Sequence, residues 1–181
     1  MFAFNNTQLS FKDRMKDLLC HLTVDEKIHM MTTHHYPVER LNIGEWYVGT
    51  EIARGFVGRD DSMKSTVFPQ PIGMASTFDD EIMESVGRVA SDEARAFYNR
   101  DKKSYLCIWG PTVDMERHPL WGRTEEAYGE DPCLTGKMTT AYTNGLIGSD
   151  KNYYKTLPTL KHFCANNNEK HRGSSNSRIP I

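Results

Sequence analysis

The sequence predicts an α/β fold in which helices cover a parallel sheet. From residue 46 onward, short β-prone runs alternate with segments of helical periodicity, which is typical of right-handed βαβ units. Residues 105–109 form an unbroken apolar run before Gly110 and Pro111, as expected for a strand that is covered on both faces. These two observations carry the prediction of the fold class.

Two helices are expected before the alternation begins. The first covers residues 11–21, with Ser10 as its N-cap. The second begins after Thr23 and ends before Pro37, since Thr23 and Glu26 have the spacing of a capping box. We therefore interpret residues 1–40 as an N-terminal helical lead-in.

Six further elements follow the lead-in. The helix with the strongest pattern covers residues 79–100, where apolar side chains recur at helical spacing. Another helix is expected from Asp131 to about residue 146, because Pro132 suits its first turn. The expected extended segments are residues 46–50, 66–68, 105–109 and 156–163.

The composition argues against several classes of partner. Lys and Arg number 22 while Asp and Glu number 24, so the net charge of −2 lacks the basic excess of a nucleic-acid-binding protein. The sequence has no polybasic segment that would indicate binding to a membrane surface. No apolar run approaches the roughly 18–20 residues needed to cross a bilayer. The first residues lack the pattern of a signal peptide, which favours a cytoplasmic location. The sequence shows no metal-ligand cluster, P-loop or dinucleotide fingerprint, so no metal and no cofactor is expected.

Polar side chains collect where the expected strands end. In parallel α/β folds this edge of the sheet forms the ligand site. Sugars need such a lining, because each hydroxyl both donates and accepts hydrogen bonds, while aromatic side chains such as Trp46 and Trp121 cover the ring face. A single charged residue at a strand end is more often an ordinary surface residue or ion-pair partner, and that alternative stays open. The three strand-end clusters are Glu51 and Arg54; Asp114, Glu116 and Arg117; and Lys161, His162, Asn166 and Asn167.

Five motifs resemble those of family 3 glycoside hydrolases, in the order and spacing of that family. Residues 66–73 (TVFPQPIG) resemble its ATVFPQPIG signature. Residues 109–114 (WGPTVD) and 117–123 (RHPLWGR) are similar to its SPNVD…RDPRWGR. Residues 125–132 (EEAYGEDP) and 161–167 (KHFCANN) are similar to its E-x-YGEDP and KHFAANN. Taken together the motifs are specific, and they cover nearly the whole chain.

The resemblance implies a retaining β-glycosidase that acts on β-glucosides or β-xylosides in the breakdown of plant polysaccharides. It implies that residues 41–181 are about the first half of a (β/α)8 TIM barrel. By motif, Arg123, Lys161 and His162 match residues that bind sugar hydroxyls in the −1 subsite, and Glu51 matches an acidic sugar ligand. Glu rather than Asp at position 51 favours the xylosidase-like branch, while Arg54 replaces the family's usual His. The absence of a PGHG loop makes an aminosugar substrate unexpected.

The resemblance also indicates which parts of the reaction these residues lack. The family's nucleophile is an Asp in a V-x-S-D-(W/Y) motif and its acid/base lies later, and neither motif occurs among the 181 residues. Asp114 matches a strand-end motif residue rather than the nucleophile, so no catalytic residue is assigned. We therefore expect an N-terminal fragment that is inactive by itself, binds β-linked glycosides and self-associates through exposed sheet edges. The alternative is a non-catalytic carbohydrate-binding or regulatory remnant.

Overall fold

The computed structural model describes residues 2–58, 62, 64–100, 102, 106–170 and 172–174. The chain divides into two compact units, Met1–Gly49 and Thr50–Ile181. Within the described ranges, no helix combines the length and apolar character needed to span a membrane. The elements in chain order are η1 (Ala3–Asn5), α1 (Phe11–His21), α2 (Val24–His29), β1 (His34–His35), η2 (Glu39–Leu41), β2 (Trp46–Glu51), α3 (Pro71–Ala75), α4 (Asp80–Arg100), β3 (Cys107–Thr112), η3 (Thr124–Glu126), α5 (Pro132–Ile147) and β4 (Leu157–Lys161).

The first unit contains the two helices that the sequence predicts before residue 40. The Ser10 side chain caps α1 by accepting a hydrogen bond from the backbone of Asp13 at 3.2 Å. Thr23 and Glu26 form the complete capping box at the start of α2. The predicted lead-in, residues 1–40, falls inside this unit. Its small core consists of Phe4, Leu22, Val38 and Leu41.

Helix α2 ends earlier than the sequence predicts. It stops at His29 rather than just before Pro37. The residues that follow turn back, and β1 pairs antiparallel with the start of β2, where His34 lies opposite Tyr47. The competing strand pairing therefore shortens the helix, which is a tertiary effect that local periodicity does not report.

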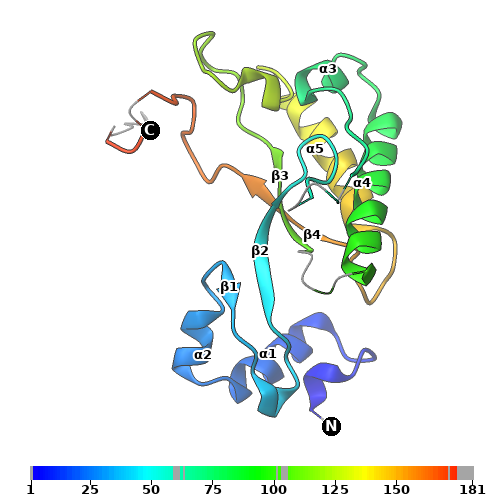
Figure 1. Cartoon of the computed structure of the whole chain (residues 1–181), viewed down its shortest axis with the longest axis vertical. Helices are drawn as coiled ribbons and strands as arrows, with labels where there is room; N and C mark the ends of the chain where they lie inside the picture. Colours follow the sequence, from blue (N-terminus) through cyan, green and yellow to red (C-terminus); the bar gives the residue numbers. More distant parts are fainter. Residues whose placement is uncertain are drawn as a thin grey trace. The chain divides into compact units, whose positions relative to one another are not determined.

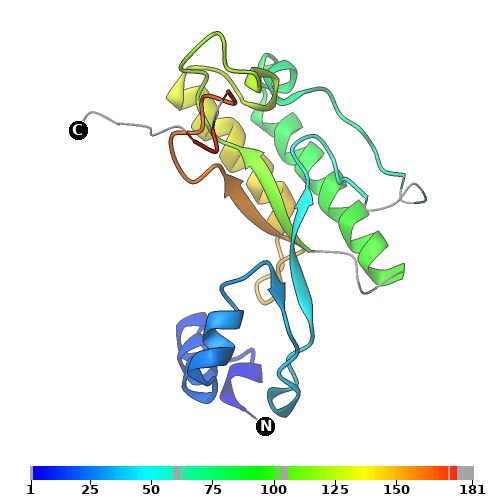
Figure 2. The ribbon, with the colours of Figure 1, turned by 60° about the vertical axis from the view of Figure 1, so that its left-hand side comes forward.

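The second unit is the α/β part of the chain. Strand β4 pairs in parallel with β3, and the N–H of Ile52, directly after β2, donates to the Trp109 carbonyl in β3 at 3.2 Å. The arrowheads of β2, β3 and β4 point the same way in Figure 2. Helices α4 and α5 pack against each other, and α5 packs on β3 and β4 (Figure 1). The fold-class prediction is therefore confirmed.

One buried cluster joins the sheet to both helices. Ile52 and Ile108 contribute to it from the sheet, Met83 and Ala90 from α4, and Tyr142 from α5. The hydroxyl of Tyr142 donates to the backbone carbonyl of Ile52. This bond ties α5 to the carboxyl end of β2, next to the edge where polar residues collect.

The segment at residues 66–68 forms no strand. The N–H of Phe68 donates to the carbonyl of Arg54 at 3.0 Å. Pro69 and Pro71 follow it and carry no backbone donor, so a regular ladder cannot continue there. Pro71 instead starts α3, a short helix that the sequence analysis did not predict. Of the expected strand at residues 105–109, residue 105 lies outside the described residues.

Candidate sugar-binding site

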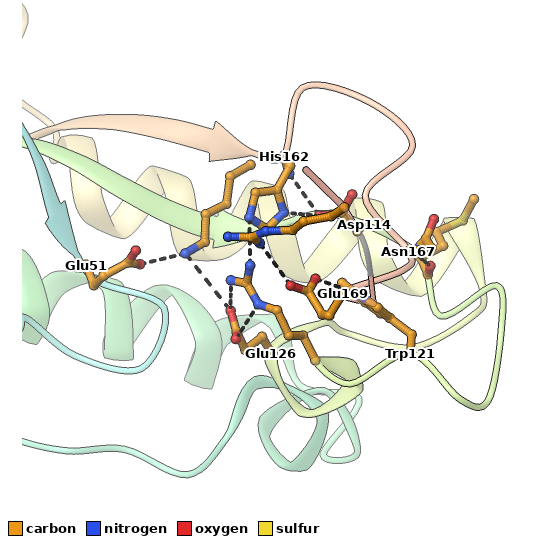
Figure 3. A network of polar contacts seen from close by, with 11 residues as sticks. Glu51, Asp114, Trp121, Glu126, His162, Asn167 and Glu169 are labelled. Carbon is orange, nitrogen blue, oxygen red and sulfur yellow. Dashed lines mark hydrogen bonds and ion pairs between the residues drawn. The ribbon is translucent and has the colours of Figure 1, made fainter. Parts of the chain in front are cut away.

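The carboxyl ends of the parallel strands bring the four predicted site residues together in the second unit. Glu51 is the last residue of β2 and Lys161 the last of β4, with His162 directly after it. Arg123 lies in the connection between β3 and α5. Their side chains belong to one network of polar contacts, which Figure 3 shows with Glu51 and His162 labelled.

Lys161 links two acidic side chains of the network. Its Nζ lies 2.6 Å from Oε2 of Glu51 and 4.0 Å from Oε2 of Glu126. The Lys161 side chain is only 13% exposed, whereas that of Glu51 is 46% exposed. The ammonium group is therefore held between two carboxylates, and Glu51 keeps acceptor capacity facing solvent.

Arg123 and Glu126 form a two-pronged ion pair. Arg123 donates from Nε to Oε1 of Glu126 at 2.7 Å and from Nη2 to Oε2 at 2.5 Å. The hydrogen bonds from Arg123 lower the pKa of Glu126, and the charges of Arg123 and Lys161 add to this, although partial burial opposes the shift. The same bond raises the pKa of Arg123. Glu126 is therefore a carboxylate and Arg123 a guanidinium at neutral pH.

His162 connects this ion pair to the end of β3. Its Nδ1 lies 2.7 Å from Oδ2 of Asp114, and its Nε2 lies 3.1 Å from Nη1 of Arg123. The backbone N–H of His162 also donates to Oδ2 of Asp114, at 2.8 Å. The Asp114 side chain is only 6% exposed, so the loops after β3 and β4 are joined by a buried carboxylate.

A second set of bonds supports the rim of this network. The indole Nε1 of Trp121 donates to Oε1 of Glu169 at 3.1 Å, and Nδ2 of Asn167 donates to the Met115 carbonyl at 2.8 Å (Figure 3). Trp121 is 3% exposed. The expectation that its ring covers a bound sugar is therefore wrong in this structure, because the ring is packed inside the loop. Trp46, the other aromatic considered, belongs to residues 1–49.

Arg54 and Glu116 belong to the strand-end clusters but take part in none of the contacts given above. Arg54 is exposed, and its backbone carbonyl accepts the bond from Phe68. Oε1 of Glu116 is buried without a hydrogen-bond partner among the described residues. Burial and the neighbouring charge of Glu130 raise the pKa of Glu116. We therefore do not count Arg54 and Glu116 among the residues of the Arg123–Lys161–His162 cluster.

The sequence model of the glycosyl hydrolase family 3 N-terminal domain matches residues 25–180. The chain belongs to glycoside hydrolase family 3. The resemblance drawn from the five motifs is thereby confirmed.

Curated members of the family match this chain over only part of their own length. It is 37% identical over 174 residues to β-D-xylosidase 3 of Arabidopsis thaliana, covering 90% of this chain and 22% of that protein. It is 36% identical over 171 residues to a β-glucosidase of Kluyveromyces marxianus, covering 91% of this chain and 19% of that protein. The chain thus spans about a fifth of the length of these relatives.

Solved structures of family 3 enzymes share the fold. A family 3 exo-β-xylosidase in complex with a xylobiose aziridine probe matches with a TM-score of 0.79 and 29% identity, over 93% of this chain and 22% of that one. The Kluyveromyces marxianus β-glucosidase in complex with glucose matches with a TM-score of 0.76 and 35% identity, over 90% of this chain and 19% of that one. The fold is therefore the N-terminal part of a TIM barrel, as predicted.

Two carboxylates of the network were not among the predicted site residues. Glu126 pairs with Arg123, and Asp114 pairs with His162. A signal for Glu126 exists, because an acidic residue three positions after an arginine in a short helical turn can reach its guanidinium. Asp114 was recognised as a strand-end residue, but its partner comes from a different strand and could not be read from local spacing.

Proposed function

We propose that residues 50–181 bind one sugar ring of a β-linked xyloside or glucoside, as part of the −1 subsite of a retaining β-glycosidase. The observation that carries this proposal is the convergence of Glu51, Arg123, Lys161 and His162 on one edge of the sheet. These residues come from three separate strand ends, and the parallel sheet places them on a common rim.

The chemistry of the network suits sugar hydroxyls. Lys161 and Arg123 offer charged donors, while Glu51 offers carboxylate acceptors, and charge-assisted hydrogen bonds of this kind are the strongest available to a hydroxyl. The cations are already held by Glu51 and Glu126 before any ligand arrives. Little side-chain entropy is then lost on binding, which favours affinity for a small ligand.

The carboxylates of this network are not suited to the bond-breaking step. A retaining mechanism uses two carboxyl groups about 5–5.5 Å apart, one of them protonated. The pKa of Glu126 is lowered, so it cannot supply that proton at neutral pH. Glu51 and Asp114 are engaged with Lys161 and His162. We therefore assign these groups to binding and expect no turnover by the 181-residue chain alone.

The expected absence of turnover is tested with an aryl β-xyloside and an aryl β-glucoside. The chain should release no aryl group above the rate in buffer. Hydrolysis that persists through repurification and disappears in Asp114→Asn would show that the site carries its own catalytic carboxylate, and it would overturn this part of the proposal.

Within the two sugar classes, we propose a preference for xylose. Xylose lacks the hydroxymethyl group of glucose, and the Glu51 side chain is one methylene longer than the Asp found in many family members. Among the relatives, those from Arabidopsis thaliana and Xylanibacter ruminicola are named as xylosidases. Glu51→Asp should move the ratio of xylose to glucose affinity toward glucose by about tenfold, the order expected for one methylene. An unchanged ratio would contradict the preference.

Sugar binding itself is tested by calorimetry or ligand-observed NMR with xylose and glucose. Lys161→Met should abolish saturable binding, because it removes the donor held at the centre of the network. Lys151→Met is the matched control, since it removes an exposed lysine from the connection between α5 and β4. Equal loss in both variants, or no saturable binding by the unchanged chain, would overturn the proposal.

We also propose that the 181-residue chain self-associates along β4. Within the described residues β4 is the terminal strand of the sheet, and Leu157 and Leu160 on it are 37% and 47% exposed. An open strand edge with apolar side chains is a template for pairing with a second copy. Light scattering after size-exclusion chromatography should show a concentration-dependent mass that Leu160→Lys reduces to that of a monomer. A monomer at all concentrations would refute the association.

A further inference from the structure

The ring of His162 lies between a carboxylate and a guanidinium. Nδ1 faces Oδ2 of Asp114 at 2.7 Å, and Nε2 faces Nη1 of Arg123 at 3.1 Å (Figure 3). Each neighbour is fixed by other bonds. Asp114 is nearly buried and receives the backbone N–H of His162 as well. Arg123 is held by Glu126 through Nε and Nη2, which leaves Nη1 directed at the ring.

These neighbours permit only one form of the imidazole. A guanidinium has donors and no acceptor, so a hydrogen bond between Nη1 and Nε2 requires that Nε2 accept and carry no proton. An ionised carboxylate only accepts, so a bond between Oδ2 and Nδ1 requires a proton on Nδ1. A doubly protonated ring would direct an N–H at the guanidinium. The opposite tautomer would do the same at Nε2 and would also leave no proton between Nδ1 and Oδ2.

We propose that Asp114 and Arg123 hold His162 as the neutral Nδ1–H tautomer, and that Glu126 is a positioning residue that directs Arg123 at the ring. The consequence for recognition is directional. Nε2 has one lone pair and can only accept, so a sugar hydroxyl that meets His162 must donate a hydrogen bond to Nε2 in place of Nη1 of Arg123. Nη1 is then released to donate to the oxygen of that hydroxyl. This consequence rests on the proposed sugar-binding function, whereas the tautomer does not.

The tautomer is measured in the sugar-free chain by long-range ¹H–¹⁵N correlation of the histidine rings at pH 7.5. The His162 signals are identified by their loss in His162→Gln. The unprotonated nitrogen is expected to be the one that couples to both carbon-bound ring protons, which identifies it as Nε2. A protonated Nε2, an average of two tautomers or a doubly protonated ring would overturn the proposal. So would an unfolded spectrum, in which the ring has no fixed neighbours.

Matched carboxylate-to-amide variants test the role of Glu126. Glu126→Gln replaces one acceptor of the two-pronged pair by an NH2 group, so Arg123 loses half of its anchor and its bond to His162 weakens. The Nε2 resonance should move toward that of an imidazole nitrogen without a donor, while Asp114 keeps the proton on Nδ1. Glu51→Gln makes the same chemical change at the carboxylate that contacts Lys161 and should leave the Nε2 resonance in place. Equal shifts in both variants, or none in Glu126→Gln, would refute the positioning role.

Adding xylose separates this proposal from the proposed function. If the sugar binds, the Nε2 resonance should shift while the tautomer stays the same, and a change of tautomer on binding would overturn the acceptor assignment. If no sugar binds, the proposed function fails, and the sugar-free spectrum still decides the state of His162.

Discussion

The crossing of α4 and α5 leaves no room for a side chain at Gly145. A Cβ placed on Gly145 would press on the backbone oxygen of Glu84 and lie 2.8 Å from the backbone N of Arg88. The neighbouring atoms are helix backbone, which cannot rotate away as a side chain can. Gly145→Ala must therefore move the two helices apart, and these helices carry much of the buried core.

The size of the effect follows from two opposing contributions. Replacing Gly by Ala inside a helix stabilises by about 1 kcal/mol. Overpacking a core costs about 1–3 kcal/mol, and backbone contacts belong at the upper end. We expect Gly145→Ala to lower the free energy of unfolding by about 2 kcal/mol, which for a chain of this size lowers the melting temperature by roughly 4–8 °C.

Gly136 provides the control on the same helix. It is exposed, and a Cβ there would meet no atom within 4 Å. Gly136→Ala should therefore show only the gain in helix propensity and raise the melting temperature by roughly 2–4 °C. Thermal unfolding followed by circular dichroism compares the two variants. If Gly145→Ala were as stable as Gly136→Ala, the close helix crossing would be refuted.

Three further outcomes are expected. Glu126→Gln should lower the free energy of unfolding at pH 7. Because the Glu126 pKa is lowered in the folded state, the difference in stability between the unchanged chain and the variant should narrow as the pH falls below about 4. Urea unfolding midpoints measured across this pH range would contradict the ion pair if that difference stayed constant. Tyr142→Phe should cost about 1–3 kcal/mol in the same assay by leaving the Ile52 carbonyl without its donor, and a neutral effect would refute that bond. Ser10→Ala should cost about 1 kcal/mol, and hydrogen exchange should report it in α1 alone.

Three helix starts could be predicted because their signals are local. Ser10 caps α1, and Thr23 and Glu26 form a capping box at the start of α2. Asp131 caps α5, with Pro132 in the first turn. Each of these contacts joins residues within one helical turn. Their bond partners are therefore visible in the printed sequence.

The predictions that failed concern places where distant segments compete. The end of α2 at His29 depends on strand pairing with β2. The packing of Trp121 depends on Glu169, which is 48 residues away. Local patterns identified an aromatic side chain near a polar edge, but they could not show whether its face would be open or covered.

For this protein, the residue pattern alone was enough to predict the α/β class and the family, and it named four candidate site residues that the structure brings together. Folding in three dimensions was needed to bring Lys161 to Glu51, 110 positions away, and to enclose His162 between Asp114 and Arg123. The physical reason is range. Caps and periodicity act over a few residues of chain, whereas ion pairs and ring tautomers depend on which side chains meet through space.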